Sequence, residues 1–491
     1  GGPVARLGDR RVATAGALDR PLSALAIDNA AEIGSVLSSS GIEHFVTERI
    51  ADGLVFGLRV EDRDRAIDAV SGLGDGWFAR WDDRGRTGLV AAAGLDNARC
   101  RRARSLTLFR SLAIGDRATG PEAGVTLTYY QLGTSRELEL VGTRGHERFD
   151  PRSPATVERV DGQTFPGRAA FPVGAGLERF VGPVDIVYTW VDGADPAWAD
   201  DFRRTATELG RDFDESALDP ARYRSRDELR YSLRSVWMYA GWVDHIYVVT
   251  AGQRPSWLVD HPSVTLVDHS DILPPEGRPT FNSHAIEASL HRIPGLSEHF
   301  IYFNDDMFLG RPTRPERFFT ANGLARVFQS GARVSGYEDG ETLAVDTAAR
   351  RGRELLVERF GRTTTHKPLH SPYPLRRSAL LAMDEDFPEQ VAATRRSRFR
   401  SPADLSVAAS LGQHYALASG CAVLGDIDTE YVHVESGRLR WHLDRIRLGR
   451  RFDTFCINET RAGRDDPERD ATLREFFEEL HPVPAPWEST P

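Results

Sequence analysis

The stretch His299–Arg311, HFIYFNDDMFLGR, combines a predicted buried strand with two adjacent carboxylates. Phe300–Phe303 is aromatic and typical of a strand, and Asn304, Asp305 and Asp306 follow it directly. Adjacent carboxylates at the end of a buried strand repel each other unless a cation lies between them. Since oxygen ligands favour Mg²⁺ or Mn²⁺ over zinc, we expect such a cation at Asp305 and Asp306. The alternative is an Asp-Asp turn in solvent, and the surrounding motifs argue against it.

The loop after an earlier strand is the second predicted ligand site. Val184–Trp190 is an apolar strand, and Asp192 and Gly193 begin the Asp/Gly/Pro loop behind it. A buried strand that runs into such a loop is typical of the ligand crevice at the carboxyl edge of an open α/β sheet. Two further strands are predicted, at His245–Thr250 and Val264–Asp268. Their alternation with helices predicts a Rossmann-like open, mainly parallel sheet, with Asp192 and the acidic pair on one edge.

A predicted helix between these strands is rich in arginine. It spans Asp219–Tyr239, and Arg226, Arg230 and Arg234 recur on it every four residues. Beside a nucleotide, each guanidinium group would donate two hydrogen bonds to phosphate oxygens. On a surface helix, the same groups would form ion pairs with carboxylates. Both alternatives stay open.

A second helix is predicted to begin at Asn282 or Ser283, either of which can cap it, and to continue through Arg292. It carries three residues of types that bind zinc, His284, Glu287 and His291. Their spacing matches neither H-E-x-x-H nor H-x-x-E-H, so a zinc site is not expected on this helix.

Composition is that of an ordinary globular protein. The 491 residues are 40% hydrophobic and 27% charged, with a net charge of −10, which argues against a nucleic-acid partner. No apolar run has membrane-spanning length and no signal peptide is expected, so we predict a cytoplasmic protein and leave peripheral association with the inner membrane open. The widely spaced Cys100, Cys421 and Cys456 predict reduced thiols rather than a metal site.

Two domains are predicted. Residues 1–175 read as an α+β accessory domain, and residues 183–491 as a catalytic domain with a variable insertion at about 312–360, which ends in a helix at Glu341–Phe360. The Pro- and Gly-rich segment Phe165–Gly182 predicts a linker. In the first domain we expect helices at Leu22–Ser40 and Asp62–Leu73, and strands at Ile42–Val46, Leu54–Val60, Ser105–Leu112, Val125–Leu132 and Glu137–Val141.

Several blocks together resemble the Stealth family. They are TWVDGADP, RDELRYSLRS, VVTAGQRPSWL, PTFNSHAIE with HRIPGLSEHF, and IYFNDDMFLG. The resemblance runs from about Val184 to Glu488. The family comprises bacterial capsule and exopolysaccharide hexose-1-phosphate transferases and the catalytic subunit of the animal GlcNAc-1-phosphotransferase.

Later blocks extend the resemblance. His366-Lys367-Pro368, with a second histidine at His370, is similar to the His-x-Pro of the family's third block. RFRSPAD is similar to an arginine-containing block and points to Arg400 and Asp404. FCINE is similar to the fourth block, with glutamate in place of the usual final aspartate. The substrate-binding positions that the resemblance implies are Trp190, Asp192, Gly193, Arg226, Arg230, Asn282, Ser283, His284, Asn304, Asp404, Asn458 and Glu459.

The resemblance implies that a hydroxyl of a glycan or polysaccharide acceptor attacks the sugar-linked phosphorus of a UDP-sugar and that UMP leaves. UDP-N-acetylglucosamine is the first donor to expect. Such a transfer requires in-line positioning, neutralised phosphate oxygens and removal of the acceptor proton. Mg²⁺ or Mn²⁺ on Asp305 and Asp306, with Arg400, would neutralise the phosphates. His366, preferred over His370, would take the proton. A homodimer is left open.

Two other functions are considered. A metal-dependent glycosyltransferase would release UDP, with the acidic pair as its metal-binding motif and Asp426 and Asp428 as a second, weak candidate. A carbohydrate-binding protein with a decayed site is disfavoured, because the acidic pair, the arginines and the histidines are all present.

Overall fold

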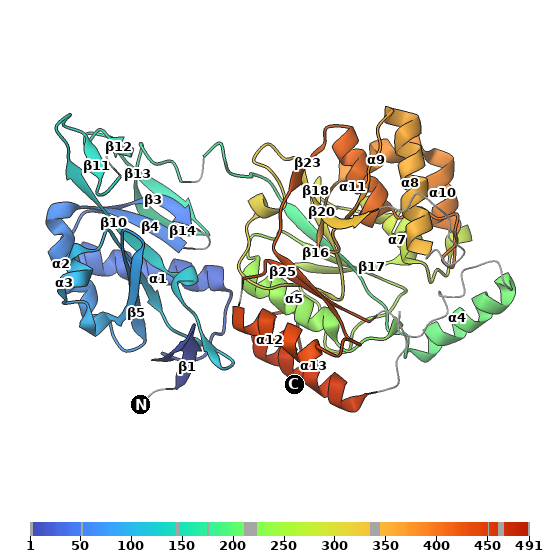
Figure 1. Ribbon diagram of the computed structural model, residues 1–491, viewed down its shortest axis with the longest axis horizontal. Coiled ribbons are helices and arrows are strands. Elements are labelled where there is room, and N and C mark those ends of the chain that lie inside the picture. Colours follow the sequence, from blue (N-terminus) through green and yellow to red (C-terminus); the bar gives the residue numbers. More distant parts are fainter. Residues whose placement is uncertain are drawn as a thin grey trace. The chain divides into compact units, whose positions relative to one another are not determined.

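The computed structural model describes residues 3–50, 53–143, 147–173, 176–210, 223–333, 344–449, 451–459 and 466–489. Its elements are labelled in Figure 1. The chain divides into two compact units. The first comprises Gly1–Arg179, Trp237–Gly241 and Phe477–Pro484, and the second comprises Phe180–Val236, Trp242–Phe476 and Ala485–Pro491.

The first unit is an α+β fold around a ten-stranded sheet of order β13-β14-β3-β4-β10-β7-β5-β6, with β11 paired to β10 and β12. A smaller sheet has the order β2-β1-β9-β8. The predicted helices are confirmed as α1 (Leu22–Ser39) and α2 (Arg63–Ser71). The strands are β1 (Val4–Leu7), β2 (Arg10–Ala13), β3 (His44–Ile50), β4 (Gly53–Arg59), β5 (Trp77–Asp83), β6 (Arg86–Ala91), β7 (Ser105–Arg110), β8 (Ala113–Ile114), β9 (Arg117–Ala118), β10 (Val125–Leu132), β11 (Leu138–Leu140), β12 (Arg148–Phe149), β13 (Ala155–Val160) and β14 (Gln163–Arg168), and a short helix α3 spans Ala98–Arg102.

The predicted linker Phe165–Gly182 is wrong at its start. Residues up to Arg168 belong to β14, which pairs along its length with β13. Phe165 is buried in the hydrophobic core with Phe56 and Leu127. The free energy of burying this side chain outweighs the poor strand propensity of the following proline. Residues 174 and 175 lie outside the described residues.

The second unit contains the predicted open, mainly parallel sheet, of order β17-β16-β15-β18-β22. The strands β15 (Val184–Thr189), β16 (Ile246–Thr250), β17 (Val264–Asp268) and β18 (His299–Asn304) are parallel, and β22 (Tyr373–Arg376) pairs antiparallel to β18. β15 is buried from Val184 to Tyr188 and β18 from Phe300 to Phe303, as expected for central strands covered on both faces. Within the described part, residues 251–263 connect β16 to β17 without the crossover helix that alternation predicted.

The arginine-rich helix is shorter than predicted. It is α5, Glu228–Tyr239, and the preceding Asp227 has a φ of 65°. A non-glycine residue in the left-handed region cannot continue a right-handed helix, so Arg226 precedes the helix instead of lying on it. The remainder of the prediction, residues 219–222, lies outside the described residues.

The helix predicted through Arg292 is also interrupted. α7 spans only Ser283–Glu287, and a separate 3₁₀ turn covers Leu290–Arg292. Asn282 caps α7 as predicted, since its side chain accepts a hydrogen bond from the backbone N–H of His284. Because the helix stops, His291 leaves the face of His284 and Glu287, and it pairs with Asp384 at 3.0 Å.

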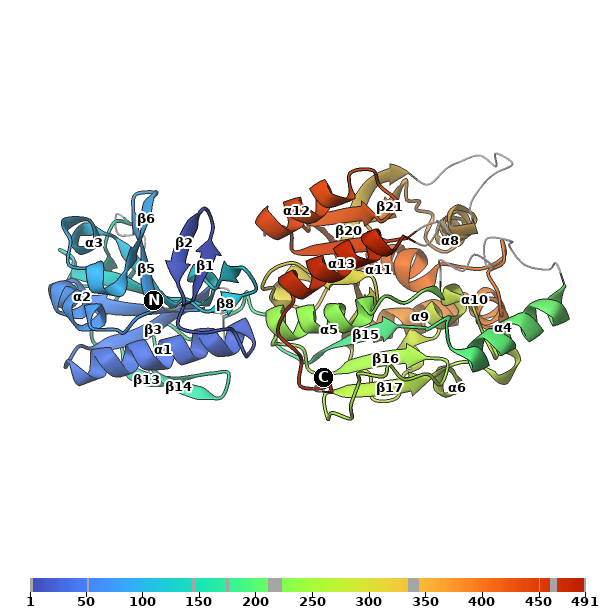
Figure 2. The ribbon, with the colours of Figure 1, turned by 90° about the horizontal axis from the view of Figure 1, so that it is seen from below.

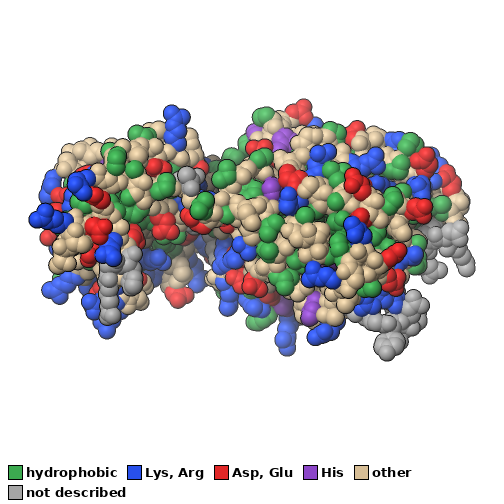
Figure 3. Space-filling model, turned by 90° about the horizontal axis from the view of Figure 1, so that it is seen from above, with side chains coloured by type: hydrophobic (Ala, Val, Ile, Leu, Met, Phe, Trp, Pro, Cys, Tyr) green, Lys and Arg blue, Asp and Glu red, His purple; other side chains and the backbone are tan. Residues whose placement is uncertain are grey.

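Further helices and small sheets complete the second unit. The helices are α4 (Pro196–Leu209), α6 (His269–Ile272), α8 (Ala344–Phe360), α9 (Arg377–Asp386), α10 (Pro388–Arg396), α11 (Gly412–Ala418), α12 (Leu439–Gly449) and α13 (Pro467–Leu480). The end of α13, from Phe477, belongs to the first unit. The sheets are β19 (Met307–Leu309), β25 (Thr454–Asn458) and β24 (Thr429–His433), and β21 (His366–Pro368), β20 (Ala325–Arg333) and β23 (Ala422–Gly425). Figure 2 shows β15, β16 and β17 side by side. On the face drawn in Figure 3, cationic and anionic side chains are interspersed.

Candidate active site

The parallel pairing of β15 and β18 brings both predicted loops to one edge of the sheet. Thr189 lies opposite Asn304 in the register, so the chain leaves the two neighbouring strands side by side, one toward Asp192 and the other toward Asp305. The Oγ1 of Thr189 and the hydroxyl of Tyr302 are 3.0 Å apart and link the two strand ends. This edge is where open α/β sheets bind their ligands.

Two side chains from β25 hold Asp306. Met307 of β19 pairs with Cys456, and the backbone N–H of Ile457 donates to the carbonyl of Asp306 at 3.0 Å. Because alternate residues of a strand face the same way, Cys456 and Asn458 both point to that carboxylate. Asn458 Nδ2 donates to Asp306 Oδ2 at 2.7 Å, and Cys456 Sγ donates to the same oxygen at 3.3 Å.

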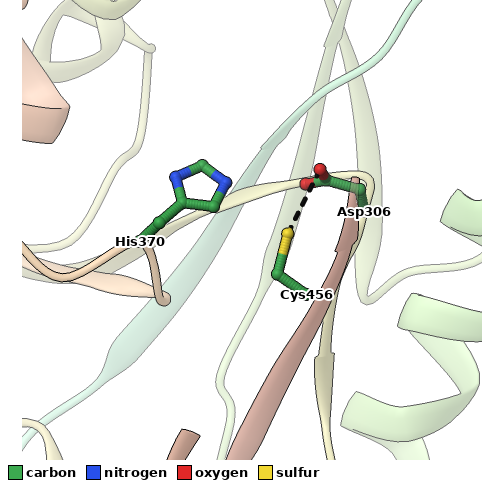
Figure 4. A group of neighbouring side chains, drawn as sticks. All are labelled: Asp306, His370 and Cys456. Atoms are coloured by element: carbon green, nitrogen blue, oxygen red, sulfur yellow. Dashed lines mark hydrogen bonds between the residues drawn. The ribbon is translucent and has the colours of Figure 1, made fainter. Parts of the chain in front are cut away.

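His370 reaches the same carboxylate from the loop before β22. One ligand atom each of Asp306, His370 and Cys456 lies within 4.8 Å of the others, and Figure 4 shows the imidazole and the thiol on different sides of the carboxylate. Nδ1 of His370 is 3.0 Å from the hydroxyl of Tyr373, and its ring packs edge-on against Tyr431. Burial lowers the pKa of His370, although Asp306 opposes this shift, so the neutral imidazole is favoured.

Burial and like charges dominate the electrostatics of Asp305. Burial, followed by repulsion from Asp306 and Glu228, raises the pKa of Asp305 well above its usual range. Among the described residues, Asp306 Oδ1 and Asn304 Oδ1 are buried oxygens without a hydrogen-bond partner. Unpaired buried oxygens beside two carboxylates are the donor set of a hard divalent cation, so these residues fit Mg²⁺ or Mn²⁺.

A second polar group surrounds the start of α7. Asn282 Nδ2 donates to Asp404 Oδ2 at 2.8 Å, and His284 Nδ1 lies 3.9 Å from the same oxygen. Arg400 donates to Ser283 Oγ at 2.7 Å. Four residues predicted to bind substrate are therefore neighbours of Arg400, and Asn282 and Asp404 have a visible structural role in joining α7 to the 397–404 segment.

Glu287 lies in this second group, and sequence reasoning considered it only as a zinc ligand. Burial raises its pKa to about 7, while Arg400 and two backbone hydrogen bonds oppose the shift. Tyr373 connects the two groups electrostatically: burial first, and then the charges of Glu287 and Asp306, raise its pKa well above its usual range. Glu287, on which Arg400 acts, and Asp306 therefore both influence Tyr373 of β22.

The predicted phosphate-binding arginines are ion-paired. Arg226 donates to Glu459 at 2.7 Å and to Asp470 at 2.8 Å. Arg230 and Arg234 both pair with Glu488 at 2.7 Å. The ion-pair alternative is therefore what the structure shows, and Glu459, the departure from the family block, is the partner of Arg226.

The loop after β15 has a defined conformation. The side chain of Gln253 accepts from the backbone N–H of Asp192 and donates to its carbonyl, at 3.1 and 2.8 Å. A Cβ on Gly193 would lie 2.7 Å from the carbonyl oxygen of Tyr223, so only glycine allows this approach. Trp190 and Asp192 are half-buried at the opening of this loop.

Other candidates contact different residues. His366 is on β21, where Nδ1 contacts Thr365 Oγ1 at 3.0 Å. Asp428 of the second acidic motif pairs with Arg311 at 3.0 Å, while Asp426 is exposed. Sequence spacing offered no sign of Cys456 as a neighbour of Asp306. A second His-x-Pro sequence, beginning at His370, was the one signal for that histidine.

Comparison with protein families finds four matches. Stealth protein conserved regions 1, 2, 3 and 4 match residues 182–208, 222–327, 369–417 and 444–491. The third match begins three residues after His366 and one residue before His370. The second match extends into the stretch predicted as a variable insertion.

Among curated relatives, two exopolysaccharide phosphotransferases of Streptomyces coelicolor are each 37% identical to this chain. The alignments cover 98% and 95% of this chain and 87% and 91% of those proteins. The exopolysaccharide phosphotransferase CpsY of Mycobacterium leprae is 42% identical over 62% of this chain and 57% of its own length. In the described residues no helix is both long and apolar enough to cross a bilayer. Four family regions and two relatives that align with at least 95% of this chain lead to one conclusion: this chain belongs to the Stealth family.

Proposed function

We propose that this protein transfers a hexose-1-phosphate, GlcNAc-1-phosphate first of all, from a UDP-sugar to a hydroxyl of a glycan acceptor and releases UMP. The observation that carries the proposal is the convergence of Asp305, Asp306, Asn458 and His370 at the carboxyl edge of the parallel sheet. The names of the relatives support phosphotransfer in polysaccharide synthesis.

The acidic pair and Asn304 would hold Mg²⁺ or Mn²⁺. When bound, the cation neutralises the pyrophosphate oxygens of the donor. Asn458 and Cys456 orient the Asp306 carboxylate through hydrogen bonds from neutral groups. These donors do not neutralise the carboxylate, so its negative charge can attract the cation. Arg400 adds a planar guanidinium that stabilises developing charge on the transferred phosphate.

His370 acts on the acceptor in this proposal. In this proposal Nδ1 of His370 donates to the Tyr373 hydroxyl, 3.0 Å away, and the lone pair is on Nε2. Nε2 is buried without a partner among the described residues. A neutral imidazole with a free lone pair takes the proton of an attacking hydroxyl. We prefer His370 to His366 because it is the histidine beside Asp306 and inside the third matched region.

The product distinguishes this proposal from its rival. A phosphotransferase cleaves the pyrophosphate and releases UMP, whereas a glycosyltransferase cleaves the anomeric bond and releases UDP. We would incubate the purified chain with Mg²⁺, a panel of UDP-sugars and oligosaccharide acceptors, and separate the nucleotides by chromatography. Acceptor-dependent UMP, with a phosphodiester in the product, is expected. UDP as the nucleotide product would establish the glycosyltransferase instead.

A further inference from the structure

The group formed by Asp306, His370 and Cys456 contains a sulfur and a nitrogen ligand beside its carboxylate. We propose that this group is a second, overlapping metal site, selective for a thiophilic divalent cation such as Zn²⁺, and that its occupation switches the enzyme off. The inhibitory half of this inference rests on the proposed function, whereas the metal-binding half does not.

The geometry suits three-ligand coordination. The ligand atoms of the three residues all lie within 4.8 Å of one another, and they come from three separate segments that pairing to β18 and β25 holds in place. In Figure 4 the imidazole and the thiol approach the carboxylate from different directions. Tetrahedral zinc with three protein ligands and one open position needs such an arrangement, and small side-chain rotations close the remaining distance.

The imidazole is oriented for ligation. Its Nδ1 contacts the hydroxyl of Tyr373 at 3.0 Å, while Nε2 has no partner in the part of the chain that the structure describes. Metal-binding histidines characteristically use their second ring nitrogen in a hydrogen bond, which fixes the tautomer and the ring orientation. The Tyr373 hydroxyl supplies that contact here.

The sulfur decides which cation is preferred. Cys456 donates its thiol proton to Asp306 Oδ2 at 3.3 Å. When a cation binds, the thiol loses this proton to solvent and becomes a thiolate. The thiolate and the Asp306 carboxylate then place two negative charges beside a divalent ion. Mg²⁺ prefers oxygen ligands and dehydrates reluctantly, whereas Zn²⁺ binds thiolate and imidazole well. Asp306 is shared by two ligand sets. With the oxygens of Asn304 and Asp305 it favours Mg²⁺, and with the sulfur of Cys456 and the nitrogen of His370 it favours Zn²⁺.

Occupation of this site removes two groups from the proposed reaction. A metal on Nε2 of His370 leaves no lone pair for the acceptor proton, and the same metal draws Asp306 away from its role toward Mg²⁺. Zinc should therefore inhibit at concentrations far below that of the Mg²⁺ that supports turnover.

Cobalt provides a direct test, because Co²⁺ bound to a thiolate has a sulfur-to-metal charge-transfer absorption in the near ultraviolet. We would add Co²⁺ to the metal-free full-length chain, under reducing conditions, and then add Zn²⁺. The band should appear at one equivalent and vanish when Zn²⁺ displaces Co²⁺. Cys456→Ser should abolish it, whereas Cys421→Ser and Cys100→Ser, which change the other free thiols, should keep it.

A second variant tests the site independently, in case Cys456→Ser does not fold. His370→Asn retains the thiol and should weaken Co²⁺ binding by at least about tenfold. Absence of the band in the unmodified chain, or its persistence in Cys456→Ser, overturns the inference. A chain that shows the band through Cys456 but produces no UMP keeps the metal site and overturns the proposed function. An active chain whose Mg²⁺-dependent turnover is unaffected by saturating Zn²⁺ overturns the inhibitory role.

Discussion

Asn458 donates a hydrogen bond of 2.7 Å to Oδ2 of Asp306, although the two residues are 152 positions apart. The Cys456 thiol donates to the same oxygen. One oxygen of the carboxylate is therefore oriented by two neutral donors, while Oδ1 has no partner among the described residues. Two neutral donors, and no ion pair among the described residues, position this side chain.

We expect Asp305→Asn and Asp306→Asn each to reduce UMP formation by on the order of a hundredfold or more, because each replaces an anionic ligand by an amide of the same size. Initial rates at saturating Mg²⁺ measure the effect. Asp426→Asn is the matched control, since that carboxylate is exposed and belongs to the rival acidic motif. Chelation by EDTA should abolish UMP formation by the unmodified enzyme, and added Mg²⁺ should restore it. Full activity of both variants would remove the acidic pair from the mechanism.

The two histidines should behave differently. His370→Ala is expected to lower turnover by about two orders of magnitude while donor affinity stays nearly unchanged, because the lost group acts on the acceptor proton. His366→Ala, on β21 and outside the third matched region, should retain most activity. Rates and UDP-sugar affinities of both variants would be compared in one series. A dead His366→Ala variant beside an active His370→Ala variant would reverse the assignment.

Arg400→Lys keeps the positive charge but loses the planar, two-pronged donor. If Arg400 stabilises the transferred phosphate, the variant should lose about 2–4 kcal/mol of transition-state stabilisation, roughly thirty- to a thousandfold in rate. Arg440→Lys, whose side chain is 72% exposed beside Glu468, is the control for a conservative change. Normal turnover by Arg400→Lys would make the hydrogen bond to Ser283 a structural contact only.

Glu287 should make stability depend on pH. Its pKa is about 7 in the folded chain against 4.5 for an ordinary glutamate, so the native state binds the proton more tightly than the unfolded state. Its contribution to stability is therefore complete below pH 4.5 and is lost as the pH rises to about 7. The loss is on the order of 3 kcal/mol, since each pKa unit corresponds to about 1.4 kcal/mol.

Urea unfolding of the unmodified chain and of Glu287→Gln at pH 5 and pH 7.5 measures this contribution. The amide does not titrate, so the variant should lose less stability than the unmodified chain over this interval. Parallel pH profiles for the two proteins would contradict the proposed titration of Glu287.

Much of the catalytic fold could be predicted from local patterns. The run Phe300–Phe303 and its neighbouring apolar segments form strands because they are β-rich and long enough to be buried, and the parallel connections place Asp192 and Asp305 on one edge. Asn282 caps its helix because its side chain competes locally for a free backbone N–H. Such features depend on residues that are close in sequence.

Helix ends and ion pairs were less predictable. The four-residue spacing of Arg226 and Arg230 suggested one cationic face, but Asp227 adopts a left-handed conformation and the helix begins after it. The partners of these arginines, Glu459 and Glu488, come from more than two hundred residues away in the chain, as the separations of 233 and 258 show. The spacing of residues along the helix cannot predict ion-pair partners that are so distant in the sequence.

The sequence by itself determined the acidic pair, the strand that carries it and the family to which the chain belongs. Only the tertiary structure decided which side chains surround Asp306. Antiparallel pairing of β22 with β18 brings the His370 loop to the sheet edge, and pairing of β25 with β19 brings Cys456 and Asn458. These contacts join segments 64 to 152 positions from Asp306. They form because long-range strand pairing buries apolar residues such as Phe308 and Phe455, whose rings stack at 4.9 Å, and not because of any motif around the polar residues themselves.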